Sequence, residues 1–295
     1  MRRLKPRKYA QLYLMALPTV LYFLVFSIYP VIQGLYMSTQ KPLLLGGGVF
    51  VGLENYRGVL KDRMFWRALS TTLQLSGGTI ALGVLIPLIV AIALNELPLP
   101  RLRKFTQTII YTPHLFSWVV VGGIWIQVLS PDGGLLNELL NLVGLQKVHF
   151  LADSMWIKPL IVLLSTWKGL GYNAVIYYAA ISSLDPEVYE AATVDGASRW
   201  QKITKLTLPL LMPTVRVVFM LSAVGALRIF DQIFVLRNAA TTRVIDVLMT
   251  YVYDLGMRQF NLGWATAASF MVTAVGIMTV GMLRKAMNVD QADLS

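Results

Sequence analysis

The stretch Leu73-Gln-Leu-Ser-Gly-Gly-Thr-Ile-Ala-Leu-Gly-Val-Leu-Ile-Pro-Leu-Ile-Val-Ala-Ile-Ala-Leu94 contains no charged residue. A helix needs about 20 mostly apolar residues to cross a hydrocarbon core roughly 30 Å thick, so this stretch predicts a transmembrane helix. Further apolar windows give six predicted spans, near residues 10–32, 73–94, 106–129, 159–181, 210–236 and 263–283. Arg216, Arg228 and Asp231 interrupt the fifth window. We therefore predict an all-α membrane protein in which residues 1–295 form a single transmembrane domain.

The composition supports this class. Of 295 residues, 56% are hydrophobic and 14% are charged, and the mean hydropathy is +0.61. Soluble domains carry about 45–50% apolar and about 25% charged residues. A soluble enzyme, a disordered chain and a nucleic-acid binder are therefore disfavoured, the last despite a net charge of +11. The chain has no cysteine, which excludes disulfides and zinc–thiolate sites, and its two histidines leave little for a histidine metal site.

Basic residues predict the orientation. The segment Met1–Lys8 is basic, and the apolar run after it is longer than the roughly 7–15 residues of a signal peptide, which favours a retained first span. Lys and Arg are about twice as dense in the loops that share a side with the termini. Both termini are therefore expected in the cytoplasm. In this interpretation the net positive charge serves mainly to orient the chain in the membrane. The alternative is that it forms a basic path for an anionic substrate.

Two predicted external loops are long enough to do more than connect helices. The first has a glycine turn at residues 46–48 and a predicted surface helix near residues 54–67. The second has a turn at residues 130–134 followed by a short amphipathic segment, Leu135–Leu142. These loops form either a docking surface or a lid.

The loop of residues 182–209 predicts a helix–turn–helix on the cytoplasmic side. Asp185 and Pro186 are favourable at the start of a helix, and Asp195-Gly196 favours its end. Ser198 and Gln201 have the spacing of a capping box that begins a second, amphipathic helix. The hairpin is either a knob that a soluble partner moves or a helix resting on lipid.

The same loop resembles a known family. Glu190-Ala-Ala192, Asp195-Gly-Ala197, Leu208-Pro209 and Pro213 match the "EAA" loop of ABC-importer permeases, although Ile203 stands where many members have Phe. Other segments resemble the sugar-type permeases related to the maltose importer: Phe50–Tyr56, Phe230–Phe234 and Thr250–Tyr253. Three more are similar to the subgroup for complex oligosaccharides and polysaccharides, which includes the alginate importer: Tyr111–His114, Leu129–Gly134 and Phe150–Asp153.

This resemblance implies an importer in the bacterial inner membrane. It would contain two different permease chains, two cytoplasmic ATPases that hold ATP and Mg, and an external solute-binding protein. The present chain would be one permease, without catalysis or a cofactor of its own, since it has no Walker A sequence. The resemblance assigns ATPase contact to Glu190, Ala191, Ala192, Asp195, Gly196, Ala197, Trp200 and Pro209.

Polar and aromatic residues in or near the spans are candidates for the substrate path, because polar groups in a membrane are costly unless they face a cavity or a partner. These candidates are Trp167, Tyr172, Asn173, Tyr177, Arg228, Asp231, Gln232 and Trp264. The aromatic residues could instead be interface anchors, Arg228 and Asp231 could form a structural pair, and His114 is expected to serve helix packing.

The main alternative function is a secondary transporter or channel for a small polar solute. That class tends to use intramembrane carboxylates and internal repeats, and this chain offers Asp231 alone as an intramembrane carboxylate. An intramembrane enzyme lacks support, because the sequence has neither His-Glu-x-x-His nor Gly-x-Ser-x-Gly.

Overall fold

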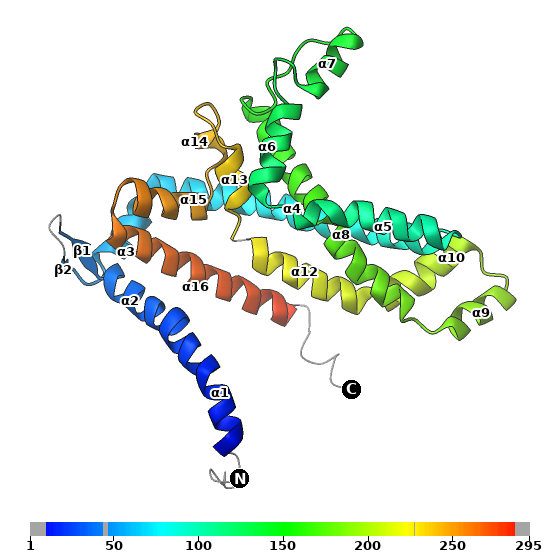
Figure 1. Ribbon diagram of the computed structural model, residues 1–295, viewed down its shortest axis with the longest axis horizontal. Coiled ribbons are helices and arrows are strands. Elements are labelled where there is room, and N and C mark those ends of the chain that lie inside the picture. The colour runs from blue at the N-terminus through cyan, green and yellow to red at the C-terminus, as the bar shows by residue number, and fades with distance from the viewer. Residues whose placement is uncertain (1–9, 44–46, 227, 287–295) are drawn as a thin grey trace. The chain divides into compact units, whose positions relative to one another are not determined.

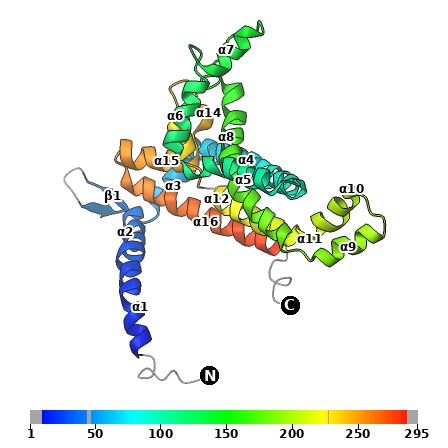
Figure 2. The same ribbon diagram turned by 45° about the vertical axis from the view of Figure 1, so that its right-hand side comes forward.

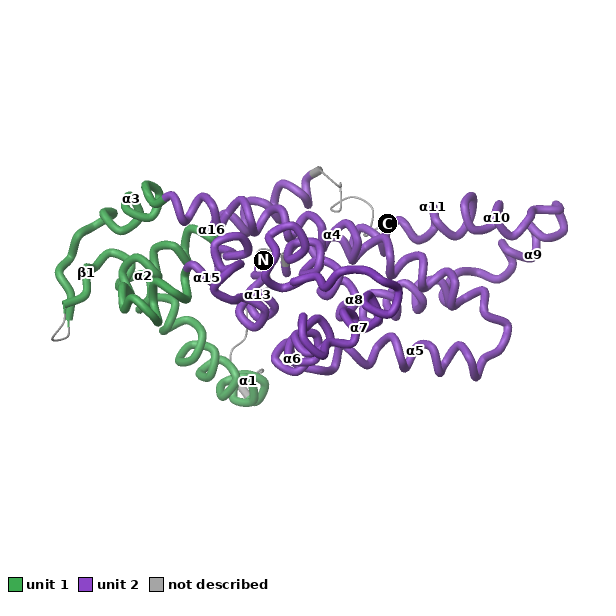
Figure 3. Tube along the Cα trace, turned by 90° about the horizontal axis from the view of Figure 1, so that it is seen from above, with its two compact units in different colours: residues 1–62, 252–273 green, residues 63–251, 274–295 purple. Residues whose placement is uncertain are grey.

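The computed structural model describes residues 10–43, 47–226 and 228–286, and most of these residues are helical (Figure 1, Figure 2). The chain divides into two compact units (Figure 3). Unit 1 consists of residues 1–62 and 252–273, and unit 2 of residues 63–251 and 274–295. The basic segment Met1–Lys8, the start of the predicted glycine turn at Gly46 and the tail after residue 286 lie outside the described residues.

Unit 1 begins with a long helix and a small hairpin. Helices α1 (Ala10–Phe23) and α2 (Tyr29–Ser38) are continuous through a π-helical turn at Leu24–Ile28. Strands β1 (Gln40–Pro42) and β2 (Gly48–Phe50) then pair in antiparallel fashion, and α3 (Glu54–Lys61) follows. The predicted surface helix near residues 54–67 is wrong as one element, because Asp62 has an extended backbone between α3 and α4.

Unit 2 is built around α8, which packs against α4 and α5, while α12 contacts both α4 and α8. Its helices are α4 (Arg63–Glu96), α5 (Pro100–Leu115), α6 (Trp118–Val128), α7 (Leu135–Leu142), α8 (Ser154–Ser182), α9 (Pro186–Val194), α10 (Arg199–Lys202), α11 (Leu208–Leu210), α12 (Met212–Ala226), α13 (Asp231–Leu236) and α14 (Thr242–Ile245). Helices α15 (Leu248–Tyr253) and α16 (Leu262–Ala286) cross the boundary between the units. The predicted amphipathic segment Leu135–Leu142 is confirmed as α7.

Three described helical stretches are long and apolar enough to cross a membrane, namely residues 11–38, 63–96 and 262–285. Two bent helix pairs could raise the number of spans to five: α5 with α6, at 101°, and residues 199–210 with 212–225, at 59°. Helix α8 has the length to cross at 29 residues but does not belong to this set. Its Lys158, Lys168 and Asn173 make it less apolar than the other spans. A sixth span therefore stays a prediction.

Two predicted spans are not straight helices. The window 106–129 bends between Leu115 and Trp118, where the Ser117 hydroxyl accepts a hydrogen bond from the Val120 amide (3.4 Å) and so begins a new helix. The window 210–236 is wrong as one helix, because α12 ends at Ala226 and α13 starts at Asp231. Phe230, with φ −140° and ψ −64°, is not helical, so the helical backbone is interrupted immediately before Asp231.

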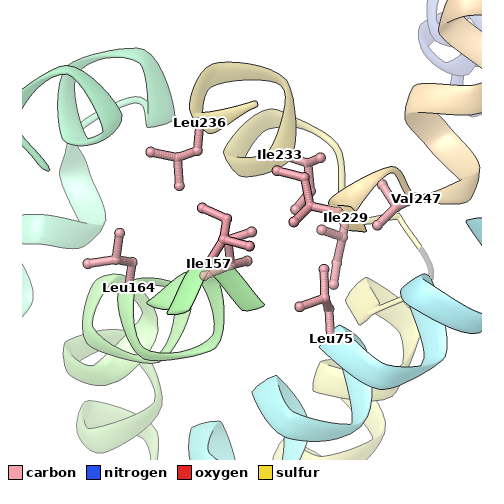
Figure 4. Close-up of a cluster of buried hydrophobic side chains, with 9 residues drawn as sticks. Leu75, Ile157, Leu164, Ile229, Ile233, Leu236 and Val247 are labelled. Atoms are coloured by element: carbon pink, nitrogen blue, oxygen red, sulfur yellow. The ribbon is translucent and has the colours of Figure 1, made fainter. Parts of the chain in front are cut away.

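The core of unit 2 has two apolar clusters. One joins α4, α8, α13 and α14 (Figure 4) and consists of Leu75, Ile157, Ile161, Leu164, Ile229, Ile233, Leu236, Ile245 and Val247. The other joins α4, α8 and α12 through Val84, Leu88, Ala91, Tyr177, Ile181, Leu211 and Val218. Because lipid is as apolar as these side chains, close packing rather than transfer from water stabilises contacts between helices in a membrane.

Two glycines permit close approach of helices in unit 2. A Cβ at Gly171 of α8 would overlap the backbone of Ile110 and Tyr111 in α5. A Cβ at Gly122 of α6 would overlap the side chain of Val235 in α13. Small residues at such contacts let backbones pack directly, and a methyl group would force them apart.

We expect Gly171→Ala to lower stability by about 1–3 kcal/mol, because α5 offers backbone rather than a movable side chain at that point. The thermal unfolding midpoint of the purified protein in detergent measures this. Gly169→Ala is the matched control, since the space around Gly169 on the same helix is open. Equal midpoints for the two variants would contradict the close contact between α5 and α8.

Candidate functional site

The 182–209 segment forms a hairpin in which α9 turns back through α10 toward α11 (Figure 2). Asp185 begins α9 by accepting a hydrogen bond from the Glu187 amide (2.9 Å). Gly196 ends this arm with φ +76°, a conformation that side chains with a Cβ seldom adopt. The Ala197 amide donates to the Ala192 carbonyl (2.9 Å), which closes the turn.

The second arm starts with the predicted capping box. The Gln201 amide donates to the Ser198 hydroxyl (3.3 Å), and the Ser198 amide donates to the Gln201 side-chain carbonyl (2.8 Å). Two side-chain hydrogen bonds connect the arms: Tyr189 with Thr207 (3.0 Å), and Lys202 Nζ to Thr193 Oγ1 (2.8 Å). The hairpin is therefore held by its own hydrogen bonds.

The hairpin is largely exposed although it carries apolar side chains at its turn. Val194 is 88% exposed and Trp200 is 72% exposed. Among the residues predicted to contact an ATPase, Ala192 and Ala197 are half-buried, and the others are exposed: Glu190, Ala191, Asp195, Gly196, Trp200 and Pro209. An exposed tryptophan beside an exposed valine is a surface suited to a protein partner.

Unit 2 also contains a cavity of about 290 Å³ between its helices. Its walls come from α4, α5, α6, α8, α12 and the segment at α13: Thr79, Ile80, Gly83, His114, Trp118, Ser165, Thr166, Lys168, Gly169, Asn173, Ser222, Gly225, Ile229 and Gln232. Apart from His114, Lys168 is the ionisable residue in this lining. The surface of the cavity is therefore mainly apolar, with several hydroxyls, two side-chain amides and one positive charge set into it.

Helices α5 and α6 hold Lys168 at the cavity wall. Its ammonium donates to the His114 carbonyl (3.2 Å) and lies 5.6 Å from the centre of the Trp118 ring, at the distance of a cation–π contact. Asp231 is close enough to attract this charge. The His114 ring stacks on Tyr172 with centroids 4.8 Å apart.

Three polar groups of the lining come from α4 and α8. The Asn173 amide donates to the Gly83 carbonyl (2.9 Å). The hydroxyls of Thr79 and Ser165 are buried and have no hydrogen-bond partner within the described part of the chain. A buried hydroxyl without a partner costs stability unless a water or a ligand satisfies it. Both residues belong to the cavity lining, so a polar solute in the cavity is one candidate to satisfy them.

The structure separates the residues predicted for the substrate path. Asn173 and Gln232 line the cavity, Tyr172 stacks on its wall, and Asp231 lies near its charge. Trp167 instead packs edge-on against Trp125, with centroids 5.6 Å apart. Tyr177 is fully buried in an apolar cluster, so it does not share the cavity face with Asn173. Trp264 belongs to unit 1 and lines a different pocket.

The predicted pairing of Arg228 with Asp231 is wrong. These two residues, both described, form no ion pair, because the helix that would place them one turn apart is broken between them. Sequence reasoning also missed the hydroxyls of Thr79, Ser165 and Ser222 as cavity residues. The expected packing role of His114 is confirmed by its stacking on Tyr172, and His114 lines the cavity as well. Small hydroxyls in an apolar helix have no periodic signal that separates a cavity wall from a helix contact.

The loop that carries α7 has a rigid base. The buried Asn137 side chain donates to the carbonyls of Ser130 (3.0 Å) and Val148 (3.1 Å) and accepts from the Val148 amide (2.8 Å). The hydrogen bond from Lys147 (2.9 Å) and its charge lower the pKa of Asp132. Whether this loop is a docking surface or a lid stays a prediction.

Comparison with known proteins identifies the family. The profile of the binding-protein-dependent transport system inner membrane component matches residues 83–287. The chain belongs to this family. It is a multi-pass permease of the inner membrane.

Among its relatives is the polygalacturonan/rhamnogalacturonan transport system permease protein YteP of Bacillus subtilis. The two are 36% identical over 91% of this chain and 85% of YteP. The arabinooligosaccharides transport system permease protein AraP of the same organism is 32% identical over 94% of this chain and 88% of AraP. A chain in the crystal structure of a bacterial ABC transporter that imports the acidic polysaccharide alginate superposes on the permease with a TM-score of 0.89. The two are 35% identical, and the match covers 96% of each chain.

We expect Ser198→Ala to loosen the second arm of the permease hairpin. Losing an N-cap costs about 1 kcal/mol, which corresponds to roughly fivefold faster local amide exchange. Hydrogen–deuterium exchange over residues 199–207 measures this. Ser183→Ala is the control, since its hydroxyl donates to the Ala180 carbonyl and caps no helix start. Equal exchange in the two variants would show that the capping box does not hold the arm.

Proposed function

We propose that this permease carries oligosaccharides or polysaccharides, acidic ones among them, into the cell in an ATP-driven importer. The observation that carries this proposal is the cavity of unit 2, where Lys168 supplies one positive charge among unpaired hydroxyls and the amides of Asn173 and Gln232. Hydroxyls and amides suit the hydroxyls of a sugar, and an ammonium suits a carboxylate. The relatives that transport polygalacturonan and alginate support an acidic substrate.

The remaining parts of the importer follow from the family. We propose a second permease that is a different chain, two ATPases that bind ATP and Mg, and an extracytoplasmic solute-binding protein. The alginate transporter crystallised with a substrate-bound periplasmic protein supports the last of these partners. In this arrangement six spans, α8 included, form one transmembrane domain with both termini in the cytoplasm.

In this proposal, the hairpin of residues 182–209 couples the permease to the ATPase. Trp200 and Val194 are exposed at its turn, and Glu190 lies on its first arm. Its second arm continues through Pro209 into α12, which contacts α4 and α8 around the cavity. Movement of the hairpin would therefore reach the cavity wall through the bent connection between α11 and α12, and alternating access requires such a connection.

We expect Gly196→Asp to uncouple transport from ATP hydrolysis while expression and membrane insertion stay normal. Asp tolerates the left-handed backbone better than most residues, and the space around Gly196 is open, so the main change is a charge at the turn. Gly196→Asn is the matched control, since it meets the same backbone demand without a charge. The ratio of substrate uptake to ATP hydrolysed in proteoliposomes measures coupling.

Glu190→Lys should uncouple as Gly196→Asp does, whereas Glu187→Lys, one turn earlier on the same helix and farther from the turn at Gly196, should not. Normal uptake per ATP in both Gly196→Asp and Glu190→Lys would remove the hairpin from the coupling mechanism.

The cavity predicts a second set of transport variants. Asn173→Ala or Gln232→Ala should reduce the kcat/KM of saccharide uptake about tenfold, the loss expected for a hydrogen bond of roughly 1–1.5 kcal/mol. Tyr177→Phe is the control, because its buried hydroxyl has no partner within the described residues. A panel of neutral and acidic oligosaccharides, assayed with the solute-binding protein, tests the proposed substrate class. Transport of none of them would refute the proposal.

A further inference from the structure

Unit 1 contains a second pocket, separate from the cavity and from the hairpin. Its volume is about 710 Å³, within the range of about 300–1,000 Å³ of small-molecule sites. Its walls come from β1, α3 and the turn that leads into α16. The side chains that matter for binding are Lys41, Glu54, Arg57, Lys61, Phe260 and Trp264, with the amides of Gln259 and Asn261.

The base of this pocket is fixed by buried contacts. The buried Asn55 side chain donates to the carbonyls of Ser38 (2.8 Å) and Gln40 (2.9 Å), which ties α3 to β1. Gly58 lies against the Trp264 ring so closely that a Cβ there would overlap it. The indole is therefore held at a set position relative to α3.

The pocket carries a net positive charge. Lys41, Arg57 and Lys61 face a single carboxylate among the lining residues, that of Glu54. Among the described residues, 10–43, 47–226 and 228–286, none forms an ion pair with these three cations. Arg57 and Lys61 are four residues apart on α3, a spacing at which like charges disfavour the helix. A bound anion would relieve this repulsion, and a guanidinium is well shaped to bind a carboxylate.

Flat apolar surface lies beside this charge. Trp264 is half-buried, and Phe260 is 76% exposed with φ +53°. A bulky residue with positive φ is strained, and such strain concentrates at ligand sites. Hydrogen bonds from the Gln259 amide to the Asp254 carbonyl (3.0 Å) and from the Asn261 amide to the Leu255 carbonyl (2.9 Å) hold the turn in this shape.

We propose that this pocket binds an anionic oligosaccharide through one uronate residue. The carboxylate lies between Arg57 and Lys61, and the apolar face of the sugar ring lies on Trp264. The side-chain amides of Gln259 and Asn261 bind ring hydroxyls. The identity of the ligand as a saccharide rests on the proposed function. The combination of aromatic faces, neutral amides and cations favours a sugar acid over a lipid phosphate, which needs neither the aromatic faces nor the amides.

The experiment uses a thiol reporter in the assembled importer in nanodiscs. The chain has no cysteine, so Val51→Cys places its sole thiol on the pocket wall, at a lining residue to which the proposal assigns no contact with the ligand. The rate at which N-ethylmaleimide modifies this chain is followed by intact mass, with and without trigalacturonate. We expect trigalacturonate to slow labelling severalfold and its fully methyl-esterified form, which has no charge, to leave labelling unchanged. Gln146→Cys, an exposed site in unit 2, is the control and should label at the same rate throughout.

A charge variant tests the same site independently of the reporter. Arg57→Gln with Lys61→Gln should raise the trigalacturonate concentration needed for protection about a hundredfold or more, because both charge-assisted hydrogen bonds to the carboxylate are lost. Arg67→Gln removes an exposed arginine outside the pocket and should leave protection unchanged. The uptake activity of each variant with a neutral oligosaccharide confirms that it is folded.

Three results would overturn the proposal: no protection by trigalacturonate, equal protection by its methyl ester, or protection by phosphatidylglycerol nanodiscs in the absence of saccharide. The last would assign the pocket to a lipid headgroup. Uptake assays separate this proposal from the proposed function. Transport of trigalacturonate without protection would refute the pocket alone, and protection without uptake of any oligosaccharide would refute the proposed function alone.

Discussion

Helix α8 can present Lys168 and Asn173 to a cavity because the helix packs closely against α4, α5 and α12. At Gly171, which has no side chain, the backbone of α8 lies directly against the backbone of α5. The apolar cluster around Tyr177 fills the space that α8 shares with α4 and α12. An ammonium and an amide in hydrocarbon would be costly, whereas in a protein-lined cavity they find partners. The Lys168 contact with the His114 carbonyl and the Asn173 contact with the Gly83 carbonyl depend on this packing. The geometry of the polar site therefore depends on the packing of the apolar core.

The hairpin of residues 182–209 is built in the opposite way. It is held by caps, a left-handed glycine and hydrogen bonds between its arms, most of them among residues near in sequence. An exposed element stabilised by local bonds keeps its shape without a core, which is what a rigid contact surface requires. In the proposed coupling role, the exposed Trp200 and Val194 supply the apolar area that another chain would cover.

This contrast explains how much the sequence could predict. The caps at Asp185 and Ser198 and the turn at Gly196 are short-range signals, and the structure has them where the sequence predicts them. Apolar length, by contrast, measures only whether a segment could cross the membrane. It gave no sign of the bend at Ser117 or of the end of α12 at Ala226, because apolar length does not register a local helix cap such as the Ser117 hydroxyl or a non-helical residue such as Phe230.

The candidate site residues also differ in how far the sequence could predict them. Asn173 and Gln232 could be selected from their polarity alone, and they do share one cavity. Trp264 was grouped with them by residue type, but it lines a pocket of unit 1 with cations from β1 and α3, segments more than 200 residues earlier in the chain. Residue type indicates what chemistry a side chain can take part in, whereas the fold decides which side chains act together.

The 59° bend at Leu211 lies between Pro209 and Pro213. Neither proline has an amide hydrogen, so at these two positions the helix has no backbone hydrogen bond to lose when the angle between α11 and α12 changes. An ordinary helix of the same length would have to break such bonds in order to flex. The two prolines therefore leave fewer backbone hydrogen bonds to oppose a change of angle here than an ordinary helix has, while the bond from the Leu211 amide to the Thr207 carbonyl (2.9 Å) still crosses the bend.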